Sequence, residues 1–103
     1  MFNNSAAADR VVVEGRITPD NSGEMRASLS RALRGKPPNL TVDLNGVTYI
    51  DSSGLATLLE AVRIARKQGT RLVLAGVHDQ PQYLLEISHL DSLFEIAGKE
   101  PGK

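Results

Sequence analysis

The sequence has no cysteine and no tryptophan, and its only aromatic residues are two tyrosines and two phenylalanines. Without cysteine there are no disulfides and no thiolate chemistry, as is usual for a protein of the cytoplasm. The formal net charge is zero, whereas proteins that bind nucleic acid or an acidic membrane surface generally carry a basic patch. So few aromatic rings also offer little for stacking on bases. We therefore expect no nucleic-acid partner.

No apolar run approaches the length that spans a bilayer, and residues 1–8 lack the basic start and apolar stretch of a signal peptide. We expect a cytoplasmic location and no direct insertion into a membrane. A hydrophobic content of 41% and a charged content of 23% are typical of a globular protein. The length suffices for one domain whose core needs no metal or disulfide. We predict a single domain over 1–103, with loose termini at 1–9 and 97–103.

Several enzyme signatures are also missing. The sequence has neither the Gly-x-Ser-x-Gly elbow of an α/β hydrolase nor the Gly-x-x-x-x-Gly-Lys-Ser/Thr loop that binds phosphates. His78 and His89, the two histidines, have no recognisable triad context, and His78-Asp79 lacks the further ligands that a metal site needs. These absences count against a serine hydrolase, an NTPase and a metal site, and we expect no metal and no cofactor.

The chain alternates strand-like and helix-like segments. Strand patterns occupy 10–15, 40–44, 71–76 and 93–96, and helical patterns run from the turn at 18–23 to Gly35, from Ser52 to Gly69, and onward from Pro81. Gly35 and Gly69 suit the position just after a helix, and Pro81 suits the first helical residue. The buried face of the last helix should comprise Tyr83, Leu84, Ile87 and Leu90. The alternation predicts an α/β domain with a mostly parallel sheet and right-handed crossovers.

One local signal allows two interpretations. Asn45-Gly46 lies between two β-like runs, which is a strong hairpin pattern. The second run, 47–50, is short and leads directly into the start of the next helix. We favour a bent strand exit, with a hairpin as the alternative.

The most informative stretch is 47–59, where a strand ends and a helix begins. From Leu55 the apolar residues Leu58, Leu59 and Val62 follow at the spacing of one helix face. The residues before it, 51–54, read Asp-Ser-Ser-Gly. Asp and Ser are preferred helix N-caps, because their oxygens accept the free N–H groups of the first turn. The position of Ser52 at a helix N-terminus also favours negative charge, so a phosphate would be tolerated there.

The other face of this helix is unusual for a solvated surface. It carries Ala56, Thr57, Ala61 and Ile64, which are small or apolar, where Lys and Glu are typical. Packing against a neighbouring helix would explain this composition. Docking of another protein beside Ser52 is the functional alternative.

Residues 50–55, Ile-Asp-Ser-Ser-Gly-Leu, following Val-Asp-Leu at 42–44 and Val47, closely resemble the signature of STAS domains. The resemblance is strongest to bacterial anti-sigma factor antagonists, and it extends from about Val11 to Ile96. It implies a mixed, mostly parallel β-sheet with the helices mainly on one side. One position differs: where antagonists usually have an acidic residue after the first strand, this chain has Thr18.

The resemblance also implies a mechanism. In this family a serine directly after the motif aspartate is phosphorylated by the anti-sigma factor, itself a serine kinase. The unphosphorylated protein binds that kinase and frees sigma, and a PP2C-type phosphatase resets the switch. In this sequence the phosphoacceptor would be Ser52, with Gly54 allowing the partner to approach the helix start. The expected partner-binding residues are Asp51, Ser53, Gly54, Ala56, Thr57 and Ala61.

A second class of STAS proteins provides the alternative. These proteins are small cytoplasmic subunits of phospholipid-transport ABC systems in Gram-negative envelopes. There the same helix N-terminus docks on the permease–ATPase assembly, and no kinase is needed.

Overall fold

The computed structural model describes residues 3–5 and 9–97. Its strands form one sheet in the order β1-β2-β3-β4-β5. They span Asn3–Ser5, Arg10–Ile17, Asn39–Ile50, Arg71–Ala75 and Glu95–Ile96, and the helices span Ser22–Arg34 (α1), Ser52–Gln68 (α2) and Asp79–Ile87 (α3). Strands β2 to β5 are parallel, and β1 is antiparallel to β2. The predicted mixed, mostly parallel sheet is therefore confirmed.

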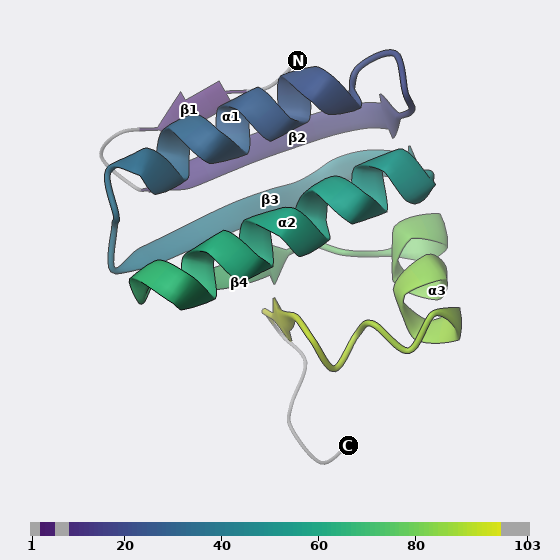
Figure 1. Cartoon of the computed structure of the whole chain (residues 1–103). Coiled ribbons are helices and arrows are strands. Elements are labelled where there is room, and N and C mark those ends of the chain that lie inside the picture. Colours follow the sequence, from purple (N-terminus) through teal and green to yellow (C-terminus); the bar gives the residue numbers. More distant parts are fainter. Residues whose placement is uncertain (1–2, 6–8, 98–103) are drawn as a thin grey trace.

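The helices α1 and α2 lie side by side over one face of the sheet, and α3 lies beside the end of β3 (Figure 1). This arrangement follows from the strand order. Each parallel connection leads to the next strand in the same direction, and crossovers of one hand then place their helices on the same face. The predicted gathering of the helices mainly on one side is thus confirmed.

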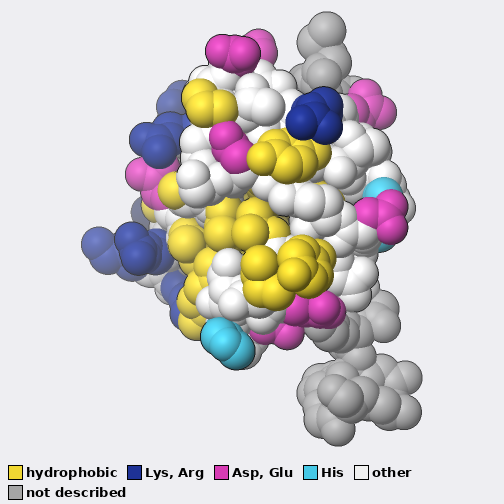
Figure 2. Space-filling view, turned by 90° about the vertical axis from the view of Figure 1, so that its right-hand side faces the viewer, with side chains coloured by type: hydrophobic (Ala, Val, Ile, Leu, Met, Phe, Trp, Pro, Cys, Tyr) yellow, Lys and Arg dark blue, Asp and Glu magenta, His cyan; other side chains and the backbone are white. Residues whose placement is uncertain are grey.

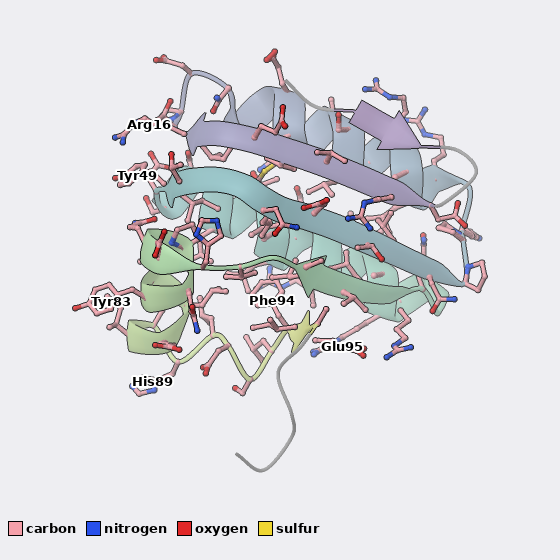
Figure 3. All side chains as sticks on the ribbon, turned by 180° about the vertical axis from the view of Figure 1, so that it is seen from behind. Arg16, Tyr49, Tyr83, His89, Phe94 and Glu95 are labelled. Carbon is pink, nitrogen blue, oxygen red and sulfur yellow. The ribbon has the colours of Figure 1, made fainter. Side chains whose placement is uncertain are left out.

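The core lies between the sheet and these two helices. Alternate residues of β2 and β3 face it, and each helix adds a stripe at helical spacing. Its largest fully buried side chains include Ile17, Met25, Leu29, Leu33, Leu40, Leu44, Leu58 and Leu74. The other face of the sheet, seen in Figure 3, carries ion pairs between Arg10 and Asp43 and between Arg71 and Glu95, as expected for a face in water.

The N-terminal prediction needs one correction. Residues Asn3–Ser5 form strand β1 and pair with residues 10–12 of β2, so this part of the expected loose terminus is ordered by the sheet. The other predicted loose segments, 1–2, 6–8 and 98–103, lie outside the described residues. β2 also continues two residues beyond Gly15, which has a φ of +87° and adjoins an irregularity in the pairing with β3. Such a bulge keeps the strand paired where a left-handed residue would otherwise end it.

The hairpin alternative at Asn45-Gly46 was wrong, because β3 continues through these residues to Ile50. The strand does not leave the sheet there, but its pairing with β2 is irregular between Asp43 and Gly46, so the favoured bend is confirmed and the exit is not. Gly46 pairs with Glu14 of β2. A Cβ atom on Gly46 would lie 3.0 Å from Cγ of Glu14, so glycine leaves room for a cross-strand side chain. The N–H of Asn45 donates to the carboxylate of Asp43 at 2.9 Å. Pairing with a distant strand thus overrides the local turn preference.

The helix ends agree with the sequence prediction only in part. Gly69 has the expected left-handed φ of +81°. Gly35 instead has an ordinary φ of −76°, and Lys36 adopts the left-handed conformation with φ +50°. Helix α3 begins at Asp79, so Pro81 is its third residue and not its first.

The predicted buried face of α3 was wrong for Tyr83 and Ile87 but holds in part for Leu84 and Leu90, which are partly buried against the core. The fully buried residues of α3 are Pro81 and Leu85, whereas Tyr83 is 62% and Ile87 54% exposed. Pro81 and Leu85 are four residues apart and therefore share a face, which the attachment of the helix start to β3 turns toward the core. A nine-residue helix at the end of a sheet has one such stripe to bury, and its other side stays in contact with water.

Candidate functional site

The stretch that joins β3 to α2 is organised by Asp51. Asp51 is the N-cap of α2, and its Oδ1 accepts the backbone N–H of Ser53 at 2.9 Å and that of Gly54 at 3.2 Å. The hydroxyl of Ser53 donates to the same oxygen at 2.6 Å. Together with the two N–H groups, that hydroxyl holds the pKa of Asp51 below its ordinary value, because these bonds favour the charged form. A negative charge therefore lies at the start of α2.

The two serines beside Asp51 have different surroundings. Ser52 is the first residue of α2 and is exposed to solvent. Among the described residues, no hydrogen bond engages its hydroxyl. Ser53 is half-buried, and its hydroxyl is already bonded to Asp51. The hydroxyl of Ser52 is thus available to a reagent from outside, and that of Ser53 is occupied.

Gly54 has a role other than the expected one. It is buried, and a Cβ atom there would lie 2.6 Å from Cγ1 of Ile50 and 2.7 Å from Cγ2 of Ile17. The absence of a side chain therefore lets the first turn of α2 approach the ends of β2 and β3. The close approach at Gly54 is between parts of this chain, and no surface is left there for a partner.

The small residues of α2 divide between two environments. Thr57 and Ala61 are each only 3% exposed, and the hydroxyl of Thr57 donates to the carbonyl of Ser53 at 3.0 Å. They line the floor of a shallow hollow between α1 and α2. Ala56 is exposed and Ile64 is 36% exposed. Packing against α1 therefore explains Thr57 and Ala61, whereas Ala56 is open to solvent.

Of the residues predicted for the site, the structure thus brings Asp51, Ser52, Ser53 and Ala56 to the surface around the start of α2. Gly54, Thr57 and Ala61 lie beneath it. They are packed within the protein and present little surface to a partner.

Two residues that the sequence did not indicate lie at the same end of the molecule. The guanidinium of Arg16 lies 4.4 Å from the centre of the Tyr49 ring, in a cation–π contact, and the two residues are paired in register between β2 and β3. Both project from the end of the sheet at which α3 also lies (Figure 3). No local pattern could have indicated them, because the pairing joins residues from separate strands.

The surface at this end is partly apolar. Figure 2 views it directly and shows hydrophobic side chains gathered in the middle of the face. Tyr83 and Ile87, one turn apart on α3, are exposed large hydrophobic residues of the helix that lies at this end. Exposed apolar groups of this kind are typical of surfaces that contact other proteins.

His78 does not form a metal site. Its Nε2 lies 2.8 Å from the carbonyl oxygen of Asn45, and its Nδ1 lies 2.9 Å from a carboxylate oxygen of Asp79. The carbonyl of Asn45 and the carboxylate of Asp79 raise the pKa of His78, because both favour the protonated ring. Within the described part of the chain, no three His, Asp or Glu residues are placed to hold a metal ion. None of the helices in that part is long and apolar enough to cross a membrane.

Comparison with known proteins places these features in a family. A family model described as Mlab, STAS domain matches residues 1–95. The anti-sigma-B factor antagonist of Listeria monocytogenes is 38% identical over 61 residues, which cover 59% of this chain and 54% of that protein. The intermembrane phospholipid transport system binding protein MlaB of Escherichia coli is 39% identical over 49 residues, 48% of this chain and 50% of that protein. The chain thus matches about half the length of these relatives.

A solved structure shows the same fold. The Bacillus cell fate determinant SpoIIAA in its phosphorylated form superimposes with a TM-score of 0.71 over 96% of this chain and 93% of that one. The two are 19% identical, so this likeness concerns the fold alone.

Proposed function

The chain belongs to the STAS domain family, and we propose that it is an anti-sigma factor antagonist that works by partner switching in the cytoplasm. Its unphosphorylated form binds an anti-sigma factor that is a serine kinase. Phosphorylation of Ser52 ends that binding, and a PP2C-type phosphatase restores it. The protein is then a substrate and a binding module without catalysis of its own.

The observation that carries this proposal is the contrast between the two serines. A kinase needs a hydroxyl that is exposed and not committed to other bonds, and Ser52 meets both conditions. Ser53 is half-buried and bonded to Asp51. The likeness to antagonists of the same family supports the assignment.

The surroundings of Ser52 supply a reason why a phosphate would act as a switch. A phosphate adds a charge of about −2 at neutral pH. The N–H groups of Ser53 and Gly54, which would otherwise stabilise an anion, already bond to Asp51. The phosphate would therefore add charge beside an existing carboxylate. Covering both groups with a partner surface removes them from water, and an unpaired buried charge costs several kcal/mol.

A second candidate function has specific support. The family description names Mlab, and the Escherichia coli relative is called a phospholipid transport system binding protein. In that case the exposed start of α2 docks on the ATPase and permease of an ABC transporter, and Ser52 is a contact residue that is not modified.

The two candidates differ in one experiment. The purified chain and its Ser52→Ala variant are incubated with the anti-sigma factor kinases of the same organism and ATP, and intact masses are recorded. We expect one phosphate on the wild type and none on the variant. No phosphate on the wild type with any of these kinases, together with co-purification with a transporter ATPase, would favour the transporter function.

A further inference from the structure

Near the site, no strand among the described residues pairs with one edge of β3. The pairing between β3 and β4 ends at Asp43 and Ala75, yet β3 continues to Ile50. On its other edge β3 stays paired with β2 up to Ile50. The backbone N–H and C=O groups along an unpaired edge need other partners when they are not in water.

Side chains from the start of α3 supply those partners. The N–H of Ile50 donates to Oε1 of Gln80 at 2.8 Å, and Nε2 of Gln80 donates to the carbonyl of Ile50 at 2.9 Å. One primary amide thus exchanges two hydrogen bonds with one residue, as an opposite residue does in an antiparallel pair. Farther along the same edge, the ring of His78 lies 2.8 Å from the carbonyl of Asn45.

The peptide group between Ile50 and Asp51 is consequently held from both sides. Its carbonyl accepts the bond from Gln80, and its N–H donates to the carbonyl of Ile17 at 3.1 Å. This peptide group immediately precedes the Asp51 carboxylate, which caps α2. Its orientation therefore determines where Asp51 and the next residue, Ser52, are placed.

We propose that Gln80 is a positioning residue for Ser52. Through the Ile50–Asp51 peptide it fixes the start of α2, and it thereby sets the direction in which the Ser52 hydroxyl is presented to the kinase. The effect of Gln80 on phosphate transfer rests on the proposed function, whereas its effect on the geometry of the helix start does not. Phosphate transfer requires an aligned hydroxyl, so a looser peptide lowers the transfer rate more than the binding of the kinase.

The first test uses the free protein and two variants of the same helix. Gln80→Ala removes both bonds to Ile50. Gln82→Ala is the matched control, because Gln82 is exposed and its amide reaches only Glu86, at 3.4 Å. Hydrogen exchange is followed by NMR for the Ile50 amide relative to that of Val13 in β2, a ratio that corrects for any general loss of stability.

In Gln80→Ala we expect the Ile50 amide to exchange about tenfold faster relative to Val13, the effect of losing a typical net hydrogen bond. The amide resonances of Ser52 and Ser53 should shift, and Gln82→Ala should leave the ratio and the resonances unchanged. The same ratio in both variants would overturn the proposal.

The second test measures phosphate transfer to Ser52 by the partner kinase at a temperature where every variant is folded. We expect Gln80→Ala to lower kcat severalfold at nearly constant KM, and Gln82→Ala to match the wild type. Gln80→Glu should be intermediate, because a carboxylate can accept the N–H of Ile50 but cannot donate to its carbonyl. A kcat for Gln80→Ala equal to that of Gln82→Ala would show that Gln80 fastens β3 without positioning Ser52. If the wild type accepts no phosphate, the proposed function fails, and the exchange ratio and the serine resonances alone decide the role of Gln80.

Discussion

Replacing Gly54 by alanine tests how closely α2 approaches the sheet. The new Cβ atom would lie 2.6 Å from Ile50 and 2.7 Å from Ile17, and both isoleucines are almost fully buried. Overpacking of this kind typically costs about 1–3 kcal/mol. Alanine also favours a helix over glycine by roughly 0.5–1 kcal/mol, which offsets part of that cost. We therefore expect Gly54→Ala to lower the free energy of unfolding by about 1–2 kcal/mol.

Gly23→Ala provides the control. Gly23 also lies in the first turn of a helix, α1, but a Cβ atom there meets nothing within 4 Å. The Gly23→Ala variant should gain the higher helix preference of alanine without a clash, and it should be at least as stable as the wild type. Thermal unfolding followed by circular dichroism should place the midpoint of Gly54→Ala roughly 5–15 °C below that of the wild type. Equal midpoints for the two variants would show that α2 does not approach β2 and β3 as closely as described.

Three further predictions concern the core, the pH dependence and the specificity of phosphorylation. Leu58→Ala should lower the free energy of unfolding, measured by urea titration, by about 2–4 kcal/mol. The control Ile64→Ala should lower it clearly less, because Ile64 is 36% exposed. Equal losses in the two variants would mean that α2 faces the other way. His78 has a pKa raised above 6.5, so its stabilising effect is complete below that pH and is lost as the pH rises through the higher folded value. The stability difference between the wild type and His78→Gln should therefore shrink above that range, and a difference independent of pH would contradict the assigned contacts. Ser53→Ala should still accept one phosphate, whereas peptide mapping of the wild-type phosphate to Ser53 would overturn the assignment to Ser52.

The fold class followed from local signals because strands and helices alternate with clear ends. The Asp51 cap and Gly69 define α2 through side-chain and backbone preferences that act within a single turn. The Asn45-Gly46 signal misled because its turn preference is weaker than the pairing of Gly46 with Glu14, which is far away in sequence. The buried face of α3 was predicted only in part for a similar reason, since tertiary contacts decide which side of a short helix packs.

The parts of the site formed by neighbouring residues in the sequence could be predicted, and the parts formed by distant residues could not. The sequence indicated Ser52 at the start of a helix, beside the capping aspartate. It did not show that Gly54 and Thr57 face inward, because small residues suit both a helix interface and a docking surface. Gln80 gave no signal at all, since it meets Ile50 across 30 residues of sequence.

The central claim is that charge at Ser52 controls partner binding without unfolding the protein. Calorimetric titration of Ser52→Ala, Ser52→Asp and the wild type against the purified anti-sigma factor tests it most directly, with melting curves of the three proteins alongside. Ser52→Asp should remain within about 1 kcal/mol of wild-type stability, because an acidic group suits a helix N-terminus. It should nevertheless bind at least a hundredfold more weakly than Ser52→Ala, as expected for burying an unpaired charge that costs about 3 kcal/mol or more. Equal affinities of the two folded variants would contradict the charge switch.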